Sequence, residues 1–390
     1  MDLHAILNAF GPQVWLAPPA FLFVITVIIV VHELGHFIAA RLCGVTVSAF
    51  SLGFGPEVAH FTDRQGTRWR LAWIPLGGYV KFVDDDNASS VPTTDEKAVS
   101  ERANASEEAR KGFYHLKPVW QRACIAAAGP VANFLLAIVV FAAFYMFAGE
   151  VQQPVRIDQV APGSPAEQAG LKPGDTILSV NGTVLDNWSR LQLIVGTSAD
   201  REITLQVDRG GQVQPVKITP RLQSDTDILG DKARTGRIGI QQQTPSGDLK
   251  YRYFGPVEAL QRGTTEVGLI LQAATRGVWD IVSGRQAITA LAGPTKMYEV
   301  AGKVATAGIE PLIRLLAIIS IAIGFTNLMP IPVLDGGHLV FYAIEAVRGR
   351  PLSQRTQEVA FRIGLALVLM LLVVTTVNHL TGVVGRMIAG

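Results

Sequence analysis

Four apolar segments in this chain are long enough to cross the hydrocarbon core of a bilayer, and they constrain its fold more than any other feature. They lie at residues 21–40, 124–147, 311–328 and 361–380, and a membrane-spanning helix needs about 20 residues. Charged residues make up only 17% of the 390-residue chain, against roughly 25% in a typical soluble protein. The sequence therefore predicts an α-helical membrane protein with four transmembrane helices.

The polar stretch between the second and third apolar segments interrupts this membrane core. Its alternating patterns and its Gly, Pro and Asn turns are typical of a folded, β-rich domain. We therefore expect a core in two halves, with a β-rich α+β domain and a helical linker between them. The predicted boundaries are residues 1–148 and 311–390 for the halves, 149–225 for the domain and 226–310 for the linker. The linker helices lie either on the membrane surface or in a soluble connection.

Residues 51–82, in the first half of the core, combine alternating apolar and polar side chains with aromatic residues and a Gly77–Gly78 pair. Alternation of this kind beside a turn signal predicts a β-hairpin. Because the hairpin follows a membrane-spanning segment directly, we expect it to associate with the membrane.

Positive charge near the apolar segments predicts the orientation, since loops rich in Lys and Arg stay in the cytoplasm. We expect the hairpin loop and the loop between the third and fourth segments on the cytoplasmic side of a bacterial inner membrane. The inserted domain and both termini are then periplasmic, although Arg314 and Arg386 oppose this orientation. The supporting residues are Arg110, Lys111, Lys117 and Arg122 before the second segment, and Arg348, Arg350 and Arg355 before the fourth.

Residues 32–36 read His-Glu-Leu-Gly-His near the end of the first apolar segment. On a helix His32 and His36 lie on one face, so both imidazoles can bind one zinc ion. Glu33 can then act as a general base toward the water that the metal activates. Ionisable side chains inside a span are costly and usually functional. The alternative is a pair of interfacial histidines that bind no metal.

A catalytic zinc ion takes three protein ligands and keeps one position open. Asp335 is the candidate for the third ligand, because it follows the third apolar segment after two prolines, Pro330 and Pro332, and precedes a Gly-Gly bend. Irregular backbone at membrane depth occurs only where it is buried in protein or lines a water-filled cavity. Without the flanking pattern, Asp-Gly-Gly is an ordinary turn.

These motifs together resemble the site-2 proteases, the family of intramembrane zinc proteases, and most closely the bacterial regulator of sigma-E protease branch. The resemblance covers nearly the whole chain. Besides residues 32–36 and 327–337, it includes Ser-Leu-Gly-Phe-Gly-Pro at 51–56, Ile-Pro-Leu-Gly-Gly-Tyr-Val at 74–80 and Gly-Pro-Val-Ala-Asn-Phe at 129–134.

The resemblance implies roles for individual residues. His32, His36 and Asp335 bind Zn²⁺, and Glu33 is the catalytic base. Asn327 holds the substrate or stabilises the reacting carbonyl. The hairpin at Gly77, Gly78 and Tyr79 pairs with the substrate as an added strand. Strand addition is physically reasonable, because a membrane helix must unwind before its peptide bonds can react.

The inserted domain also resembles a known module. Residues 160–182 contain a short helix, a Gly-Asp turn and a strand that ends in Asn181–Gly182, as in bacterial PDZ domains. Such domains bind extended peptide ends, so a peptide C-terminus is a candidate ligand; a steric gate is the equally weighted alternative. Residues 224–243 lack a second copy of this segment.

The function that these inferences favour is intramembrane zinc endopeptidase. Its substrates would be single-pass membrane proteins, such as an anti-sigma factor after a first cleavage, and remnant signal peptides, in regulated intramembrane proteolysis and envelope stress signalling. A non-catalytic PDZ membrane adaptor with a structural metal site is the alternative. A formal net charge of +2 gives no sign of a nucleic-acid partner.

Overall fold

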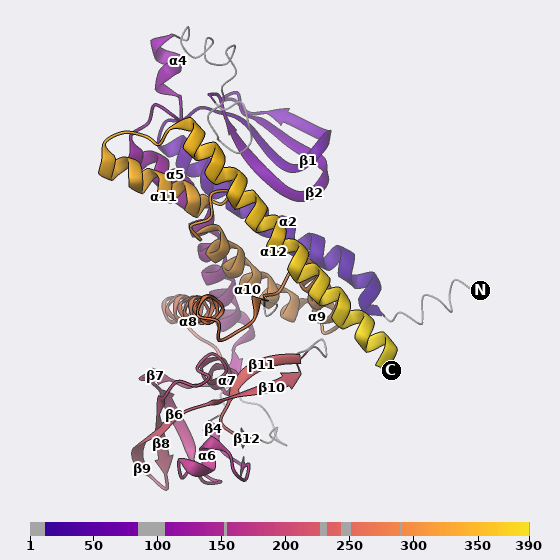
Figure 1. The fold of residues 1–390 in the computed structure, drawn as a ribbon, viewed down its shortest axis with the longest axis vertical. Helices are drawn as coiled ribbons and strands as arrows, with labels where there is room; N and C mark the ends of the chain where they lie inside the picture. Colours follow the sequence, from indigo (N-terminus) through magenta and orange to yellow (C-terminus); the bar gives the residue numbers. More distant parts are fainter. Residues whose placement is uncertain are drawn as a thin grey trace, which may run out of the picture. The chain divides into compact units, whose positions relative to one another are not determined.

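The computed structural model describes residues 12–84, 106–151, 154–226, 232–242, 251–288 and 291–389. The chain divides into two compact units. The membrane unit comprises Met1–Val140 and Leu291–Gly390, and the inserted unit comprises Phe141–Ala290. Each unit has its own buried core, and we describe the two separately (Figure 1).

Long apolar helices dominate the membrane unit. Its helices are α2 (Pro12–Leu42), α4 (Glu107–Lys111), α5 (Val119–Ala143), α9 (Pro294–Thr306), α10 (Ile309–Asn327), α11 (Asp335–Arg348) and α12 (Gln354–Ala389). Among the described residues, four stretches are long and apolar enough to cross a membrane: Trp15–Leu42, Val119–Ala148, Ile309–Asn327 and Gln354–Val384. The predicted apolar segments lie within or across these stretches, so the prediction of four such helices is confirmed.

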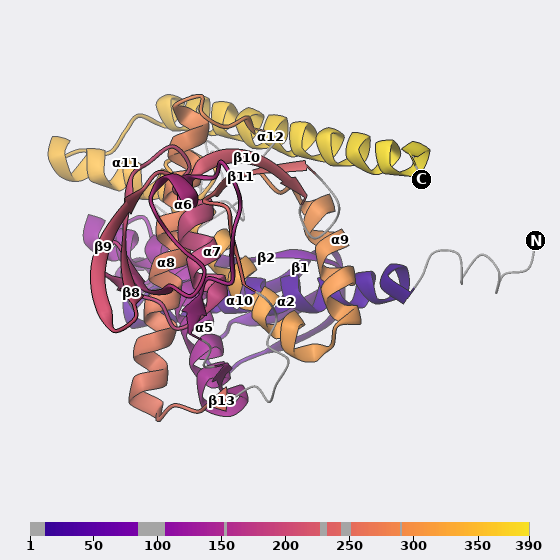
Figure 2. The same cartoon turned by 90° about the horizontal axis from the view of Figure 1, so that it is seen from below.

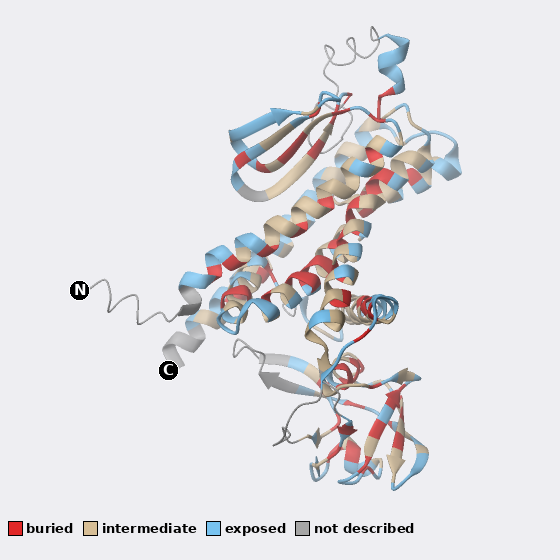
Figure 3. Cartoon of the chain, turned by 180° about the vertical axis from the view of Figure 1, so that it is seen from behind, coloured by how far each residue is buried: buried red, intermediate tan, exposed pale blue. Residues whose placement is uncertain are grey.

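The first half of α2 packs against α9 and α10, which are its neighbours in both views of the ribbon (Figures 1 and 2). Val24 and Ile28 of α2 are fully buried there, beside Ala301 of α9 and Leu316 of α10. The outer faces of the long helices are exposed although their side chains are apolar (Figure 3), as at Ile363 on α12. Exposed apolar surface on this scale suits contact with lipid.

The predicted hairpin is present as β1 (Val47–Thr62) and β2 (Arg68–Phe82), which pair antiparallel. It begins a few residues earlier than the sequence indicated. The start of β1 pairs with β2 twice, since Ser51 lies opposite both Tyr79 and Arg70. The start of β1 therefore lies beside two stretches of β2, one that contains Arg70 and one that ends at Phe82.

The end of β2 is fastened to the segment before α5. The Asp84 carboxylate accepts hydrogen bonds from the backbone N–H groups of Tyr114 and His115, each at 2.9 Å, and lies 2.9 Å from His115 Nδ1. Burial alone would raise the pKa of Asp84, but these hydrogen bonds outweigh burial and lower it. Phe82 also stacks on Tyr114, with ring centroids 4.6 Å apart. These contacts fix the position of the hairpin against the membrane helices.

The segment between α10 and Asp335 differs from the sequence prediction in one respect. It is irregular up to residue 334, as two prolines require, but Gly336 and Gly337 form no bend and lie in the first turn of α11. The physical reason is close packing. A Cβ at Gly337 would lie 2.6 Å from Pro332 Cα, and one at Gly336 would overlap the backbone at Leu328 and Met329. The glycines allow the loop to pack on its own helix.

The inserted unit is a β-rich domain followed by a long helix. Strands β4, β6, β8 and β9 are neighbours in that order, β7 pairs with β6, β10 pairs with β11, β12 with β5 and β13 with β3. The strands are β3 (Glu150–Val151), β4 (Val155–Arg156), β5 (Gln159–Val160), β6 (Thr176–Val180), β7 (Thr183–Val184), β8 (Ile203–Arg209), β9 (Gln212–Ile218), β10 (Arg221–Thr226), β11 (Lys232–Arg237), β12 (Ile240–Gln241) and β13 (Tyr251–Arg252). The helical elements are η1 (Phe144–Ala148), α6 (Pro165–Gln168), α7 (Trp188–Gly196) and α8 (Pro256–Val282).

The core of this domain extends past residue 225, the boundary predicted from the sequence. Ile238 is 3% exposed and packs with Ile157 and Leu191 in the main cluster. The reason is strand pairing, because β12 lies antiparallel to β5 near the start of the domain. Short strands that pair with distant partners carry little signal in the sequence.

Ion pairs connect α8 to the domain within the inserted unit. Arg262 of α8 lies 2.7 Å from carboxylate oxygens of both Glu150 and Asp186, and Arg190 of α7 lies 3.0 Å from Glu266. The side chain of Arg190 is 8% exposed. Half-buried networks of this kind are stronger than exposed pairs, so α8 is attached to the domain rather than free of it.

Candidate metal centre

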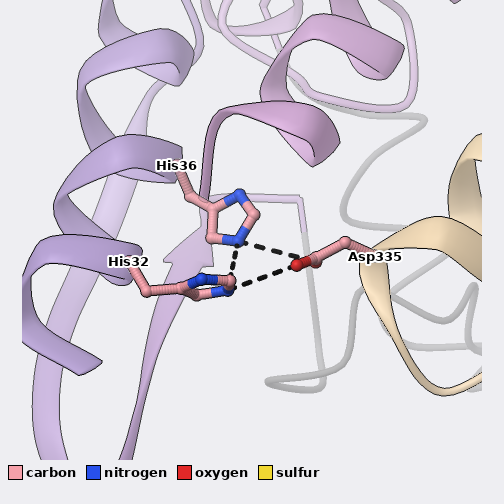
Figure 4. A group of neighbouring side chains, drawn as sticks. All are labelled: His32, His36 and Asp335. Carbon is pink, nitrogen blue, oxygen red and sulfur yellow. Dashed lines mark hydrogen bonds and ion pairs between the residues drawn. The ribbon is translucent and has the colours of Figure 1, made fainter. Parts of the chain in front are cut away.

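His32 and His36 lie one turn apart on α2, and their imidazoles turn to the same side of the helix (Figure 4). Their Nε2 atoms are 3.2 Å apart. The two rings meet edge to face, with centroids 4.8 Å apart. Helical periodicity predicts this proximity, and the side chains realise it where α2 faces α5 and α11.

Asp335 reaches the histidines from the start of α11. Its Oδ2 atom lies 3.2 Å from His32 Nε2, and its Oδ1 atom lies 3.5 Å from His36 Nε2 (Figure 4). Burial would raise the pKa of this carboxyl, but the contacts with the two imidazoles outweigh burial and lower it. One ligand atom from each of the three residues lies within 4.8 Å of the others. The structure thus brings together residues separated by about 300 positions in the sequence.

Helix α5 supports the two imidazoles from behind. His36 Nδ1 lies 2.8 Å from the backbone carbonyl oxygen of Ile125. A carbonyl can only accept a hydrogen bond, so Nδ1 carries the proton and Nε2 keeps its lone pair for a metal. His32 Nδ1 lies 3.2 Å from the side-chain amide of Asn133. Sequence reasoning assigned no role to either α5 residue.

Two glycines allow α2 and α5 to approach this closely. A Cβ at Gly35 would lie 2.8 Å from the Cβ of Ala132 and would overlap the carbonyl oxygen of Ala128. A Cβ at Gly129 would lie 2.8 Å from His32 Nε2 and would overlap the His36 ring. Small residues permit such close contact between membrane helices. Gly129 therefore leaves the space in which the imidazoles meet.

Replacing Gly129 with alanine should weaken zinc binding, because the new methyl group displaces the His36 ring from Asp335. Changes to the groups that surround and orient metal ligands typically cost about 10–100-fold in metal affinity, and we expect an effect of this size here. A competition titration against a chelator of known affinity measures this. The matched control is Gly268→Ala on α8, where a Cβ meets nothing within 4 Å; there, zinc binding should be unchanged. Equal zinc affinity in both variants would contradict the packing argument.

The proposed ligands line one pocket of about 330 Å³. Among its other lining residues are Glu33, Asn327, Gly77, Gly78 and Tyr79. Every candidate site residue inferred from the sequence thus lines the same cavity. Glu33 accepts a backbone hydrogen bond from Val80, and the position of a Cβ on Gly78 is 3.0 Å from Glu33 Cγ. The final stretch of β2 therefore lies directly against Glu33.

Tyr79 and Gly77 are held in place by the rest of the hairpin. The Tyr79 hydroxyl accepts a hydrogen bond from Arg70 at 2.8 Å, and its ring stacks on Phe54 at 6.2 Å. Gly77 has φ of 138°, a conformation that favours glycine, and the Phe54 ring occupies the place of a Cβ. His338, left without a role by the sequence, also lines the pocket.

The donor atoms fit zinc. Two imidazole nitrogens and a carboxylate oxygen form a ligand set typical of catalytic zinc, which keeps a fourth position open. His36 satisfies the further requirement that a ligating imidazole donates its other N–H to an acceptor. The pocket beside these atoms leaves room for a substrate group.

Comparisons with known proteins show which family the chain resembles. The family model described as Peptidase family M50 matches residues 20–371. A candidate zinc metalloprotease of Brucella suis biovar 1 is 43% identical over 349 residues, which cover 90% of this chain and 91% of the relative. Metalloprotease MmpA of Caulobacter vibrioides is 37% identical over 367 residues, which cover 90% of this chain and 92% of the relative.

A crystal structure of the PDZ domain of the SdrC-like protein of Listeria innocua is similar to part of the chain. The match has a TM-score of 0.20 and 18% identity, and covers 24% of this chain and 97% of that domain. The family model and the relatives cover most of the chain, and the relatives are named as metalloproteases. The chain therefore belongs to peptidase family M50, the site-2 protease family, and is an integral membrane zinc metalloendopeptidase.

Proposed function

We propose that His32, His36 and Asp335 hold the zinc ion and that Glu33 is the catalytic base. The observation that supports this assignment most directly is the convergence of the three ligand atoms within 4.8 Å. Zinc supplies, when bound, a Lewis acid that polarises the scissile carbonyl and activates water. Glu33 takes the proton from the attacking water and later gives it to the leaving amine. Its place in the same pocket as the ligands supports this role.

We further propose that the substrate binds in an extended conformation along the last stretch of β2, at Gly77, Gly78 and Tyr79. Backbone hydrogen bonds to this stretch would replace those that the substrate helix loses when it unwinds. Gly77, Gly78 and Tyr79 line the same pocket as the proposed ligands, and this position supports the proposed role. Asn327, the last residue of α10, then holds the substrate or stabilises the reacting carbonyl. Its position in the pocket supports either role.

The substrate class that fits this site is the membrane-spanning helix of a single-pass protein. We propose an anti-sigma factor already shortened by another protease, with remnant signal peptides as further substrates. The cell would use such cleavage in regulated intramembrane proteolysis and envelope stress signalling. The helices around the pocket are apolar. This supports the proposal that the substrate reaches the site from the lipid, because an apolar substrate helix stays in the bilayer.

We propose a location in the bacterial inner membrane, and the distribution of Lys and Arg supports the orientation of the chain there. The active site would then lie toward the cytoplasm, and the inserted PDZ-like domain toward the periplasm. Both termini would also be periplasmic; residues 1–11 and 390 lie outside the described part of the chain. The PDZ-like domain would either bind a newly formed peptide C-terminus or exclude untrimmed substrates by size.

Substrates that unwind easily should be cleaved faster. Replacing two leucines near the cut site of a substrate helix with glycine lowers the cost of unwinding by about 2 kcal/mol. That change corresponds to a rate increase of up to roughly 30-fold. Initial rates in proteoliposomes measure it. Alanine at the same two positions is the control, since it shortens the side chains but favours the helix. Equal rates for glycine and alanine substrates would exclude unwinding as a determinant.

Purified protein in proteoliposomes tests the proposed substrate class. A single-pass substrate should be cleaved faster when its periplasmic part has been removed than when that part is intact. Deletion of the inserted domain between residues 151 and 254 is less informative, because α8 is attached to it by ion pairs. If intact and shortened substrates were cleaved at the same rate, selection for trimmed substrates would be ruled out.

A further inference from the structure

The two histidines of the proposed metal site are held in different ways. His36 donates its Nδ1–H to a backbone carbonyl, that of Ile125, at 2.8 Å. Because the acceptor is a backbone atom, this contact does not depend on the side chain of another residue. Among the described residues, the neighbour of His32 Nδ1 is a side chain and not a carbonyl: it is the amide of Asn133, at 3.2 Å. The proton position on His32 therefore depends on one side chain.

Asn133 is fully buried in α5, at 0% exposure. Within the described part of the chain, its Oδ1 atom is buried and has no hydrogen-bond partner, although an amide oxygen can accept two hydrogen bonds. An unpartnered buried oxygen is costly. A buried amide within an apolar helix is costly as well, and polar side chains in such places are usually functional.

A half-turn about the Cβ–Cγ bond of Asn133 exchanges its amide nitrogen and oxygen. With the oxygen toward His32, the ring donates Nδ1–H to Oδ1, and the amide nitrogen takes the place that the oxygen had occupied without a partner. His32 Nε2 then has a lone pair, and it is this atom that lies 3.2 Å from Asp335 Oδ2 and 3.2 Å from His36 Nε2. Each orientation gives the Asn133 amide one hydrogen bond to His32, but only the one with the oxygen toward the ring leaves His32 Nε2 free to bind a metal.

The backbone of Asn133 packs against α10. Its backbone carbonyl accepts a hydrogen bond from the Ser320 hydroxyl of α10 at 2.9 Å. A Cβ at Gly324, one turn further along α10, would lie 3.2 Å from Asn133 Cβ. Asn133 therefore lies between α10 and His32 of α2.

We propose that Asn133 is a positioning residue for the metal centre: its side-chain oxygen accepts Nδ1–H of His32 and keeps Nε2 of that ring free to bind zinc. This inference rests on the proposed ligand set. The competing explanation is that Asn133 only joins helices by hydrogen bonds, as polar residues in membranes often do. Helix joining affects stability, whereas positioning affects zinc affinity and the His32 tautomer.

Two variants separate these explanations. Asn133→Leu keeps a similar volume but has no acceptor, and zinc affinity should fall by about 10–100-fold. Asn133→Asp keeps an acceptor at the same place, and zinc affinity should remain within a few-fold of the original. Ser320→Ala, which removes the hydrogen bond to the Asn133 backbone, is the matched control and should leave zinc affinity unchanged. Chelator competition gives the affinities, and thermal unfolding of the zinc-free proteins gives their stabilities.

The His32 tautomer can be measured in the unaltered protein, so this test remains valid if a variant fails to fold. Protein labelled with ¹⁵N-histidine and loaded with zinc should show the His32 proton on Nδ1. A His32 proton on Nε2, or an Asn133→Leu variant that binds zinc as tightly as the original protein, would overturn the proposal. If instead the proposed ligand set were wrong, the result would differ: the unaltered protein would bind no zinc, or Asp335→Ala would bind it normally.

Discussion

Replacing Glu33 with glutamine should reduce the rate of peptide-bond cleavage by about 10²–10⁴-fold, the contribution typical of a general acid–base group. Glutamine has nearly the same volume as glutamate and keeps an oxygen that can accept the hydrogen bond from Val80. It cannot take a proton from water. The fold and the metal site should therefore persist while the chemistry stops. Initial rates with a shortened single-pass substrate measure the loss of cleavage. The zinc content of the same preparation measures whether the metal site persists.

The matched control for this variant is Glu310→Gln. Glu310 lies in the first turn of α10 with its side chain 59% exposed, and its partner Arg314 is 3.8 Å away. This exposed pair should contribute little, so cleavage should continue at the original rate. If Glu33→Gln cleaved the substrate as fast as Glu310→Gln does, Glu33 would not be the base.

Replacing Asp335 with alanine should remove zinc from the protein. Loss of a group that only supports a ligand costs 10–100-fold in metal affinity, so loss of a ligand should cost at least about 100-fold. The imidazoles of His32 and His36, whose Nε2 atoms are 3.2 Å apart, would remain, but the carboxylate that faces both of them would be lost. Cleavage should fall below detection, because no Lewis acid remains. Zinc content after dialysis against a weak chelator measures the effect.

Asp208→Ala provides the control for this second variant. Asp208, in β8 of the inserted unit, accepts a hydrogen bond from the backbone N–H of Gly211 and does not line the pocket. Its loss should leave one zinc ion per chain. Normal zinc content in Asp335→Ala would remove this residue from the ligand set and would favour a different third ligand, for which His338 in the same pocket is a candidate.

The sequence predicted most of the membrane unit because long apolar runs and helical spacing are local signals. The four apolar segments and the pairing of His32 with His36 follow from these signals alone. The helix ends did not follow from them: α12 continues to Ala389, beyond the predicted end at residue 380. Hydropathy detects the apolar middle of a helix but not the polar turns that extend it.

Contacts between distant segments were harder to predict. The proline-broken pattern identified Asp335, but only the structure shows that Gly336 and Gly337 open α11 and pack on the preceding loop. Asn133 belongs to a motif that the sequence analysis had noted. Its role could not be read there, because it depends on the position of α5 relative to His32. Burial of a polar residue in an apolar helix was the available signal.

The most direct test of the account is to identify the cut bond and its dependence on zinc in one experiment. The purified protein is reconstituted with a shortened single-pass substrate, and the products are analysed by mass spectrometry before and after treatment with a chelator. We expect a cut inside the apolar segment of the substrate, which is lost on chelation and restored by adding zinc. A cut outside that segment, or cleavage that persists in fully chelated protein, would contradict it.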